Sequence, residues 1–294
     1  MGMFFKQRNS SDKENVFGQV KKQAKVITFL NQKGGVGKTT LSFNTAHALK
    51  NVGHKVLCID MDPQSNLSLL FNIDSTNSEA PHIFQLLINS VKELKTLHTE
   101  SNWLDVVIKG DIDIIPAGQE LSGFELSVAG INSPRPLVLK RFLEKSKILE
   151  SYDYIIIDSP PTLGLLVVNI LCAAEGLMVP FRPDEFSKKG LSHLHEVLLD
   201  IEDMGVAAAP SVLAHIPNLV DARRKQEGSD LKSIVKDLKE DLKTVPVVEP
   251  FYNRASLVKS HAAKKSVYDY NSKDFKNLQI QFNQLVNIIE EWRV

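Results

Sequence analysis

The stretch that decides the fold is NQKGGVGKTT at residues 31–40, which directly follows the apolar run KVITFL at 25–30. A short run of this kind is typical of a buried strand, and residues 39–51 have the spacing of a helix. Glycines lack the Cβ atoms that would keep a backbone from wrapping around a phosphate group, and a helix N-terminus favours an anion. The strand–loop–helix context therefore predicts a phosphate-binding loop. A glycine-rich turn that binds nothing is the alternative.

Two lysines and a threonine give this loop its expected chemistry. Lys38 can reach the β- and γ-phosphates of a nucleotide, and the Thr39 hydroxyl is placed to bind Mg²⁺. The usual first glycine of such a loop would fall on Gln32, and an extra lysine, Lys33, stands ahead of the glycines. Two lysines at one phosphate site suggest that Lys33 compensates negative charge elsewhere, on the nucleotide of a partner subunit. The residues expected to bind ATP here are Lys33, Gly34, Gly35, Val36, Gly37, Lys38, Thr39 and Thr40.

Short apolar runs bounded by turns recur along the chain. They lie at residues 26–30, 56–59, 112–115, 154–157, 176–179 and 212–216. Most of them do not alternate between apolar and polar residues, which is typical of strands buried on both faces. Helix-period segments lie between many of the runs, at residues 39–51, 137–149, 163–174, 186–204 and 231–242. This alternation predicts a doubly wound α/β fold, a mostly parallel sheet with helices on both faces. Together with the phosphate-binding loop, it indicates the P-loop NTPase class.

The remaining segments predict one domain with short extensions. Residues 74–78 are expected to form a loop and 83–88 a short helix, and no linker-like stretch divides residues 25–294. Residues 1–24 are expected to form a flexible basic arm, because they are too few to bury a core and are mainly polar and basic. The tail is expected to form an amphipathic helix, because its apolar residues recur at spacings of three and four. These residues are Phe275, Leu278, Phe282, Leu285, Ile289 and Trp292.

Composition limits the class of protein. The 294 residues are 43% apolar, enough for a large core, and 35 Lys+Arg balance 35 Asp+Glu, which argues against a protein that binds polyanions over its whole surface. Cys58 and Cys172 are too few and too far apart for a disulfide framework or a thiolate metal site. With no signal-like apolar run and no uncharged stretch near the ~18 residues of a membrane span, the sequence predicts a soluble protein of the reducing cytosol.

Three acidic residues follow two of the expected strands. Asp60 and Asp62 come after the second strand, two residues apart on extended chain, so both can face the same way. Asp158 ends the fourth strand. Because open α/β sheets bind ligands at the carboxyl ends of their strands, we expect these side chains beside the phosphate loop. The alternatives are a solvated turn opened by the Asp-Pro pair and a helix cap provided by Asp158.

Three motifs together resemble the deviant Walker A ATPases of the ParA/MinD family. KGGVGKTT at 33–40 is similar to the family's phosphate loop, and DMDPQ at 60–64 and IDSPP at 157–161 stand where that family has its two switch segments. The preceding Asn-Gln pair and the DMDPQ form favour the ParA branch. The resemblance extends from about residue 25 to about residue 269.

The resemblance implies a role for each residue of these motifs. The expected catalytic residues are Lys33, Lys38 and Asp62, and the expected Mg²⁺-binding residues are Thr39, Asp60 and Asp158. The lysines would act on the charge that develops at the transferred phosphoryl group, Lys33 from a partner subunit, and Asp62 would position the attacking water. Asp60 would support the metal site through water. The segment after Asp158, stiff at two prolines and hinged at a glycine, suits a switch that senses the γ-phosphate.

A polar residue at the end of the sixth strand is the candidate for binding the base. Pro217-Asn218 follows residues 212–216, and in ParA relatives an Asn at this strand end contacts the adenine edge, so the resemblance assigns Asn218 to ATP binding. A Pro-Asn turn without contact to the base is the alternative. Residues 250–253 are expected to close the other side of the base.

A basic segment near the C-terminus is the candidate DNA-binding surface. Residues 251–265 contain no acidic residue and hold Arg254, Lys259, Lys264 and Lys265. Non-specific DNA binding is driven by phosphate contacts of this kind, although a solvated helix face is the common alternative. The resemblance favours DNA, because ParA proteins keep an arginine at the position of Arg254 that contacts DNA once the ATP-bound dimer has formed.

The resulting hypothesis is an ATP-dependent partition ATPase with Mg²⁺ as cofactor and weak basal activity. ATP would close two chains into a sandwich dimer that binds DNA non-specifically, and a ParB-like adaptor on the cargo would stimulate hydrolysis and release, which places the protein on the nucleoid. One alternative is a ParA-like positioning ATPase for a protein cargo such as a chemosensory array or a microcompartment. A MinD-like membrane regulator is less favoured, because the tail carries no net positive charge.

Overall fold

The computed structural model describes residues 23–74, 81–92, 102–131, 134–184, 186–221, 223–241, 245–253 and 255–292. Most of the expected basic arm, residues 1–22, and residues 75–78 of the expected loop lie outside the described residues. Arg254, the first residue of the candidate DNA-binding surface, lies outside them as well.

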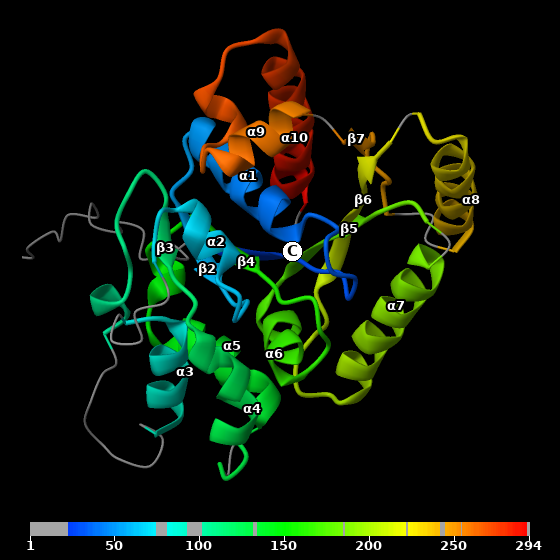
Figure 1. Ribbon diagram of the computed structural model, residues 1–294. Coiled ribbons are helices and arrows are strands. Elements are labelled where there is room, and N and C mark those ends of the chain that lie inside the picture. The colour runs from blue at the N-terminus through cyan, green and yellow to red at the C-terminus, as the bar shows by residue number, and fades with distance from the viewer. Residues whose placement is uncertain are drawn as a thin grey trace, which may run out of the picture.

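Seven strands form one parallel sheet (Figure 1). They are β1 (Lys25–Phe29), β2 (Val56–Asp60), β3 (Asp113–Ile115), β4 (Tyr154–Asp158), β5 (Gly176–Phe181), β6 (Ser211–Val220) and β7 (Phe251–Tyr252). Their order across the sheet is β3-β2-β4-β1-β5-β6-β7, and each of these pairings is parallel. Because the first strand lies in the middle and the chain winds outward in both directions, the sheet confirms the doubly wound α/β fold.

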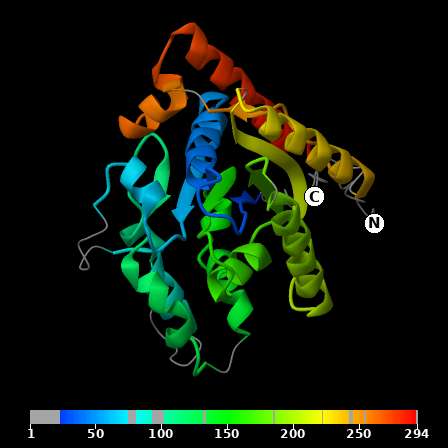
Figure 2. The ribbon, with the colours of Figure 1, turned by 45° about the vertical axis from the view of Figure 1, so that its right-hand side comes forward.

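Helices cover both faces of this sheet. They are α1 (Lys38–Asn51), α2 (Asn66–Leu70), α3 (Ile83–Lys92), α4 (Phe124–Ser127), α5 (Val138–Lys145), α6 (Leu165–Ala173), α7 (Ser187–Asp203), α8 (Lys225–Asp241), α9 (Ala255–Ala262) and α10 (Lys273–Glu291). Figures 1 and 2 show α1, α9 and α10 together on one side of the sheet and α3, α4 and α5 on the other. The α7 helix covers β5 beyond α6, with α8 next to it.

The central strands are buried on both faces, as their unbroken apolar sequences predict. In β4, Ile155 and Ile157 pack in the core cluster that contains α3, α5 and α6. Tyr154 and Ile156 point the other way, into the cluster formed with α1 and α10. Since successive side chains of a strand alternate between faces, an all-apolar strand needs a helix layer on each side.

Several elements differ from the sequence-based expectation, α5, α8 and β7 among them. The helix expected at 137–149 ends at Lys145, because Lys147 adopts a left-handed φ of 57° and the chain continues as the 3-10 helix η4 (Ile148–Glu150). The α8 helix begins at Lys225, six residues before the expected start. The early start was not predicted, because the first turns of this helix are polar and lack the apolar spacing. The short edge strand β7 was not predicted, since two residues carry no periodicity.

The tail and the cysteines agree with expectation. The apolar stripe lies on α10, where Phe275, Leu278, Phe282, Leu285 and Ile289 are buried, and Trp292 follows the helix end. Both cysteines are free and buried. Within the described part of the chain, no helix has both the length and the apolar character needed to cross a bilayer.

Candidate functional site

The phosphate loop joins β1 to α1 at the middle of the sheet edge. Gly35 and Gly37 have φ values of 71° and 88°, a conformation that other L-residues rarely adopt. At Gly37 a Cβ atom would also lie 2.2 Å from Asn218 Nδ2, so this position has no room for a side chain. Gly37 is the N-cap of α1 and provides no capping side chain, which leaves the N–H groups of the first turn available to an anion.

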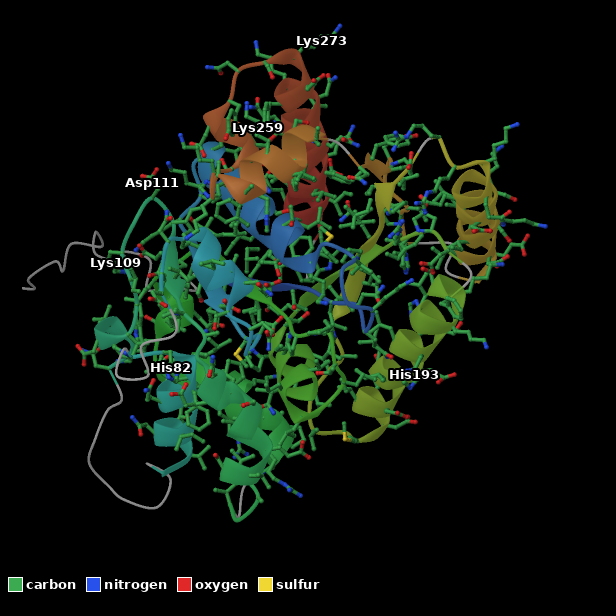
Figure 3. The ribbon with its side chains drawn as sticks, in the orientation of Figure 1. His82, Lys109, Asp111, His193, Lys259 and Lys273 are labelled. Atoms are coloured by element: carbon green, nitrogen blue, oxygen red, sulfur yellow. The ribbon has the colours of Figure 1, made fainter. Side chains whose placement is uncertain are left out.

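The three residues before the glycines all contact the segment from β5 to α7. Asn31 Nδ2 donates to the Pro180 carbonyl at 2.7 Å, and Gln32 Oε1 lies 2.7 Å from Nδ1 of His193, which Figure 3 labels on α7. Lys33 Nζ pairs with the Asp184 carboxylate. The lysine that we expected to serve a partner's nucleotide is therefore engaged within its own chain.

Lys38, the second lysine, lies inward, among the carboxylates. It begins α1 and is only 7% exposed. Burial lowers the pKa of its ammonium group, and the charges of Asp158 and Asp62 partly offset this effect. A buried cation held between two acidic groups is poised to exchange these partners for phosphate oxygens.

Asp158 ends β4 directly opposite Asp60 at the end of β2. Its Oδ1 accepts a hydrogen bond from Ser42 Oγ at 3.1 Å, whereas its buried Oδ2 has no hydrogen-bond partner among the described residues. Burial, and then the neighbouring charge of Asp60, raise the pKa of Asp158, and the nearby Thr39 hydroxyl opposes the rise. An unpartnered carboxylate oxygen next to a threonine hydroxyl fits a Mg²⁺ site. The N-cap of α6 is Gly164, so Asp158 does not cap that helix.

Asp60 is saturated by protein donors. Its Oδ1 accepts the Asp62 N–H at 3.1 Å, and its Oδ2 accepts the N–H of Ser68 at 2.8 Å and the hydroxyl of the same residue at 2.7 Å. Burial raises the pKa of Asp60, and the hydrogen bonds from Ser68 and Asp62 oppose that rise. With all of these donors in place, Asp60 organises the loop after β2, and its contact with a metal through water stays a prediction.

Asp62 is 6% exposed, so the solvated Asp-Pro turn is the wrong alternative. Its Oδ1 accepts the Gln64 N–H at 3.0 Å, burial raises its pKa, and the charge of Lys38 opposes this shift. A cavity of about 420 Å³ lies between Asp62–Gln64 and Pro160–Leu166, with Phe124 on its wall. The two segments expected to respond to the γ-phosphate therefore line one cavity.

Asn218 lies directly behind the phosphate loop. It is in strand β6 rather than in a turn, and it pairs in register with Phe251 of β7, within the segment expected to flank the base. Its Nδ2 donates to the Val36 carbonyl at 2.7 Å. The side chain thus supports the loop, and its contact with adenine stays a prediction.

The candidate DNA-binding lysines lie apart from this site. Lys259 is exposed on α9, and Lys265 is exposed in the turn that follows, where Lys264 is half-buried with a left-handed φ of 52°. Figure 3 shows Lys259 on α9, with Lys273 higher in the view at the start of α10. The sequence alone did not single out Lys273.

Asp184 and Ser68 were also missed from the sequence. Asp184 follows the carboxyl end of β5, and the rule that selected Asp60 and Asp158 would have found it. Ser68 lies inside the short helix α2, and nothing in its sequence context marks it.

A central glycine loop after β1, with acidic residues at the ends of β2 and β4 on a parallel sheet, defines a P-loop NTPase of the deviant Walker A type. The family model described as an AAA domain, AAA_31, matches residues 24–207, more than half of the chain. The chain belongs to this family, and its relatives place it with the ParA/Soj-type partition ATPases.

Two curated relatives illustrate the match. The chain is 36% identical over 170 residues to the sporulation initiation inhibitor protein Soj of Bacillus subtilis, covering 58% of this chain and 63% of that protein. It is 30% identical over 250 residues to the chromosome-partitioning ATPase Soj of Treponema pallidum, covering 83% of this chain and 90% of that protein. The matched part thus spans slightly less than two thirds of the Bacillus protein.

Solved structures share the fold over nearly the whole chain. An ATP complex of a Cyanothece McdA variant gives a TM-score of 0.75 at 22% identity, covering 93% of this chain and 99% of that one. A plasmid partition protein from Borrelia burgdorferi bound to AMPPNP gives 0.68 at 22% identity, with 92% and 99% covered. Cobyrinic acid a,c-diamide synthase from Mycobacterium smegmatis with ADP and magnesium gives 0.69 at 24% identity, with 92% and 97% covered.

Proposed function

We propose that the chain is an ATP-dependent partition ATPase that uses Mg²⁺. The observation that carries the proposal is the convergence of Lys38, Asp62 and the unpartnered Oδ2 atom of Asp158 at the carboxyl edge of the sheet, beside the glycine loop. The family membership and the nucleotide bound in the solved Borrelia and Mycobacterium proteins support the same conclusion.

Each residue of the site has a part in hydrolysis. The loop N–H groups and Lys38 would hold the β- and γ-phosphates of ATP, while Thr39 and Asp158 would hold Mg²⁺. Magnesium, when bound, supplies positive charge to the phosphate oxygens. Asp62 orients the attacking water, and Asp60 fixes the Asp62 backbone through the hydrogen bond at 3.1 Å. Asn218 supports the loop at Val36 and, in this proposal, also contacts the adenine base.

A dimer completes this site. Lys33 serves the nucleotide of the second subunit and leaves Asp184 to do so, which couples ATP binding to dimer formation. In the dimer two copies of the basic surface formed by Arg254, Lys259, Lys264 and Lys265 act together, so weak phosphate contacts add up to retention on DNA. A ParB-like adaptor on the cargo then stimulates hydrolysis, and the monomers are released from the nucleoid. The basic arm, residues 1–24, precedes this single ATPase domain.

The first test is co-sedimentation of the protein with DNA of unrelated sequences in the absence of nucleotide and with ADP, ATP or AMPPNP, across a salt series. Retention that needs ATP, ignores sequence and weakens with salt is expected. The double change Lys264→Glu and Lys265→Glu should abolish retention, whereas Lys232→Glu on the exposed face of α8 should not. Normal retention in the double variant would remove these lysines from the DNA-binding surface.

A ParA-like positioning ATPase for a protein cargo is the second candidate, because it uses the same ATP switch and the fold likeness to McdA fits it equally. Retention of DNA with an adaptor that binds a protein assembly instead of a DNA centromere would favour it. Liposomes of anionic lipid form a third arm of the sedimentation experiment. Binding to them in place of DNA would favour the MinD-like regulator.

A further inference from the structure

Ser68 lies at the centre of a closed hydrogen-bond network behind the loop after β2. It is fully buried in α2, and both its N–H and its hydroxyl donate to Asp60 Oδ2, at 2.8 and 2.7 Å. The same hydroxyl oxygen accepts the Ala117 N–H at 3.1 Å. One side chain thus joins a carboxylate at the sheet edge to a backbone group 49 residues away.

The network ends at the residue assigned to the attacking water. Asp60 Oδ1 accepts the N–H of Asp62, and the Asp62 carboxylate in turn accepts the Gln64 N–H, so the backbone of this loop depends on where Asp60 is held. Asp60 cannot rotate without losing donors on both oxygens, and a buried carboxylate that loses a donor is costly. The position of Asp62 is therefore set from Ser68.

We propose that Ser68 is a positioning residue for hydrolysis, which holds Asp62 in line through Asp60. The inference rests on the proposed function, because it needs Asp62 to act on water. It assigns Ser68 no contact with nucleotide: the residue acts through Asp60 and through the loop backbone.

The other end of the network is anchored to the segment between β3 and the 3-10 helix η2 (Gln119–Gly123). The Pro116 carbonyl accepts the N–H of Ile83, the first residue of α3, at 2.9 Å. Gly118 packs so closely on His82 that a Cβ atom there would lie 2.6 Å from the imidazole ring. Figure 3 shows His82 at the start of α3. Ala117 is thus fixed on both sides, and it gives Ser68 a rigid reference point.

A hydroxyl deletion and a conservative replacement test the proposal. Ser68→Ala removes the side-chain donor to Asp60 and the acceptor for Ala117 while keeping the backbone N–H, and Ser68→Thr keeps the hydroxyl. Ser65→Ala is the matched control, because Ser65 is buried directly before α2 and its hydroxyl has no hydrogen-bond partner within the described residues. Thermal unfolding establishes that each variant is folded.

The readouts are steady-state ATP hydrolysis, the dissociation constants for ADP and AMPPNP, and hydrogen exchange of peptides spanning 60–66 and 114–119. In Ser68→Ala we expect kcat to fall about 10- to 100-fold, because small misplacements of a reacting group cost this much. The nucleotide dissociation constants should stay within about threefold, since the lost positioning matters in the transition state. Exchange should rise in both peptides. Ser68→Thr should restore kcat, and Ser65→Ala should match the parent protein.

Two results would overturn the proposal. Unchanged exchange at 60–66 in Ser68→Ala would mean that Ser68 does not hold the Asp62 loop. Faster exchange with an unchanged kcat would mean that the loop is held without consequence for hydrolysis. If the parent protein itself did not hydrolyse ATP, the proposed function would fail instead, and the exchange result would still decide whether Ser68 holds the loop.

Discussion

Lys33 and Asp184 form an ion pair between the phosphate loop and the start of α7, within one chain. The Asp184 carboxylate also accepts the Phe186 N–H at 3.2 Å and the Ser187 hydroxyl at 3.0 Å. Burial raises the pKa of Asp184, and the hydrogen bonds from Lys33 and Ser187 outweigh this, so the pKa lies below its usual range. The Asp184 carboxylate is charged at neutral pH and holds Lys33 in an ion pair within its own chain.

Replacing Asp184 should therefore make ATP-dependent dimers form more readily. In the proposed dimer two such pairs open, and half-exposed pairs are each worth about 1 kcal/mol or less, which limits the gain in affinity to about 30-fold. Analytical ultracentrifugation of Asp184→Asn with AMPPNP measures it. Ser187→Ala, which alters the same cluster but leaves Lys33 paired, is the control. Weaker dimers in Asp184→Asn would mean that the pair persists in the dimer.

The two lysines of the loop should differ in what they contribute. Lys38→Ala should abolish binding of ADP and ATP, because Lys38 is the buried cation between Asp62 and Asp158. Lys33→Ala should keep ADP binding and lose ATP-dependent dimerisation. Isothermal titration with ADP and sedimentation with AMPPNP separate the two effects. Normal ADP affinity in Lys38→Ala would refute the assignment of the phosphate loop.

Asp62→Ala should uncouple binding from hydrolysis. Without the carboxylate that orients water, single-turnover hydrolysis is expected to slow by about 100-fold or more, while AMPPNP affinity is retained. The ATP-bound dimer should then persist on DNA, which phosphate release and co-sedimentation record together. Turnover at the parental rate would exclude Asp62 from catalysis.

Two glycines of the loop allow a matched test of its geometry. Gly35→Ala places a Cβ atom in the left-handed region, and no atom of the described residues other than its chain neighbours lies within 4 Å of it, so the change should lower the free energy of unfolding by about 1 kcal/mol. Gly37→Ala adds a clash with Asn218 and should cost a further ~1–3 kcal/mol. Chemical denaturation without nucleotide gives both values. Equal losses would contradict the close approach of Asn218.

Stability should fall in mild acid because of buried histidines. Burial lowers the pKa of His47 from 6.5 to about 4, against an opposing effect from the charge of Asp269. The folded state keeps this ring neutral while the unfolded chain takes up a proton, so stability is lost as the pH falls from about 6.5 toward 4. The free energy of unfolding falls by at most about 1.4 kcal/mol per pH unit through this one group.

The variant His47→Phe keeps ring contacts with Phe43 and Phe71 and removes this titration. Its free energy of unfolding relative to the parent protein should rise as the pH falls through that window and stay constant above about pH 7.5. Denaturation curves at half-unit pH steps measure the difference. A constant difference across the whole range would show that His47 does not titrate on unfolding.

The sequence predicted the parts of the site that are built from local patterns. A glycine loop between a strand and a helix, and acidic residues directly after strands, can be located because each pattern occupies a few consecutive residues. The parallel sheet followed from the same reasoning, since unbroken apolar strands such as β4 need cover on both faces.

The contacts between distant segments could not be predicted. Lys33 and Asp184 are 151 residues apart and meet only because β5 lies beside β1 in the sheet. The order of strands is a property of the tertiary fold and could not be read from the sequence. The sequence analysis therefore assigned Lys33 only to a partner's nucleotide and missed its ion pair with Asp184. Asn218 is a similar case: its contact with the loop at Val36 depends on the position of β6 next to β5.

The contacts of residues 31–33 with α7 give this helix the properties of a lever. It is 17 residues long, which corresponds to about 25 Å, and the phosphate loop holds it at Asp184 before its first turn and at His193 in its second. A tilt of about 5° at this end displaces the far end, near Met204, by about 2 Å, because a helix of this length is stiff. In the proposed switch, release of Lys33 from Asp184 would be transmitted along α7 to the surface near Met204.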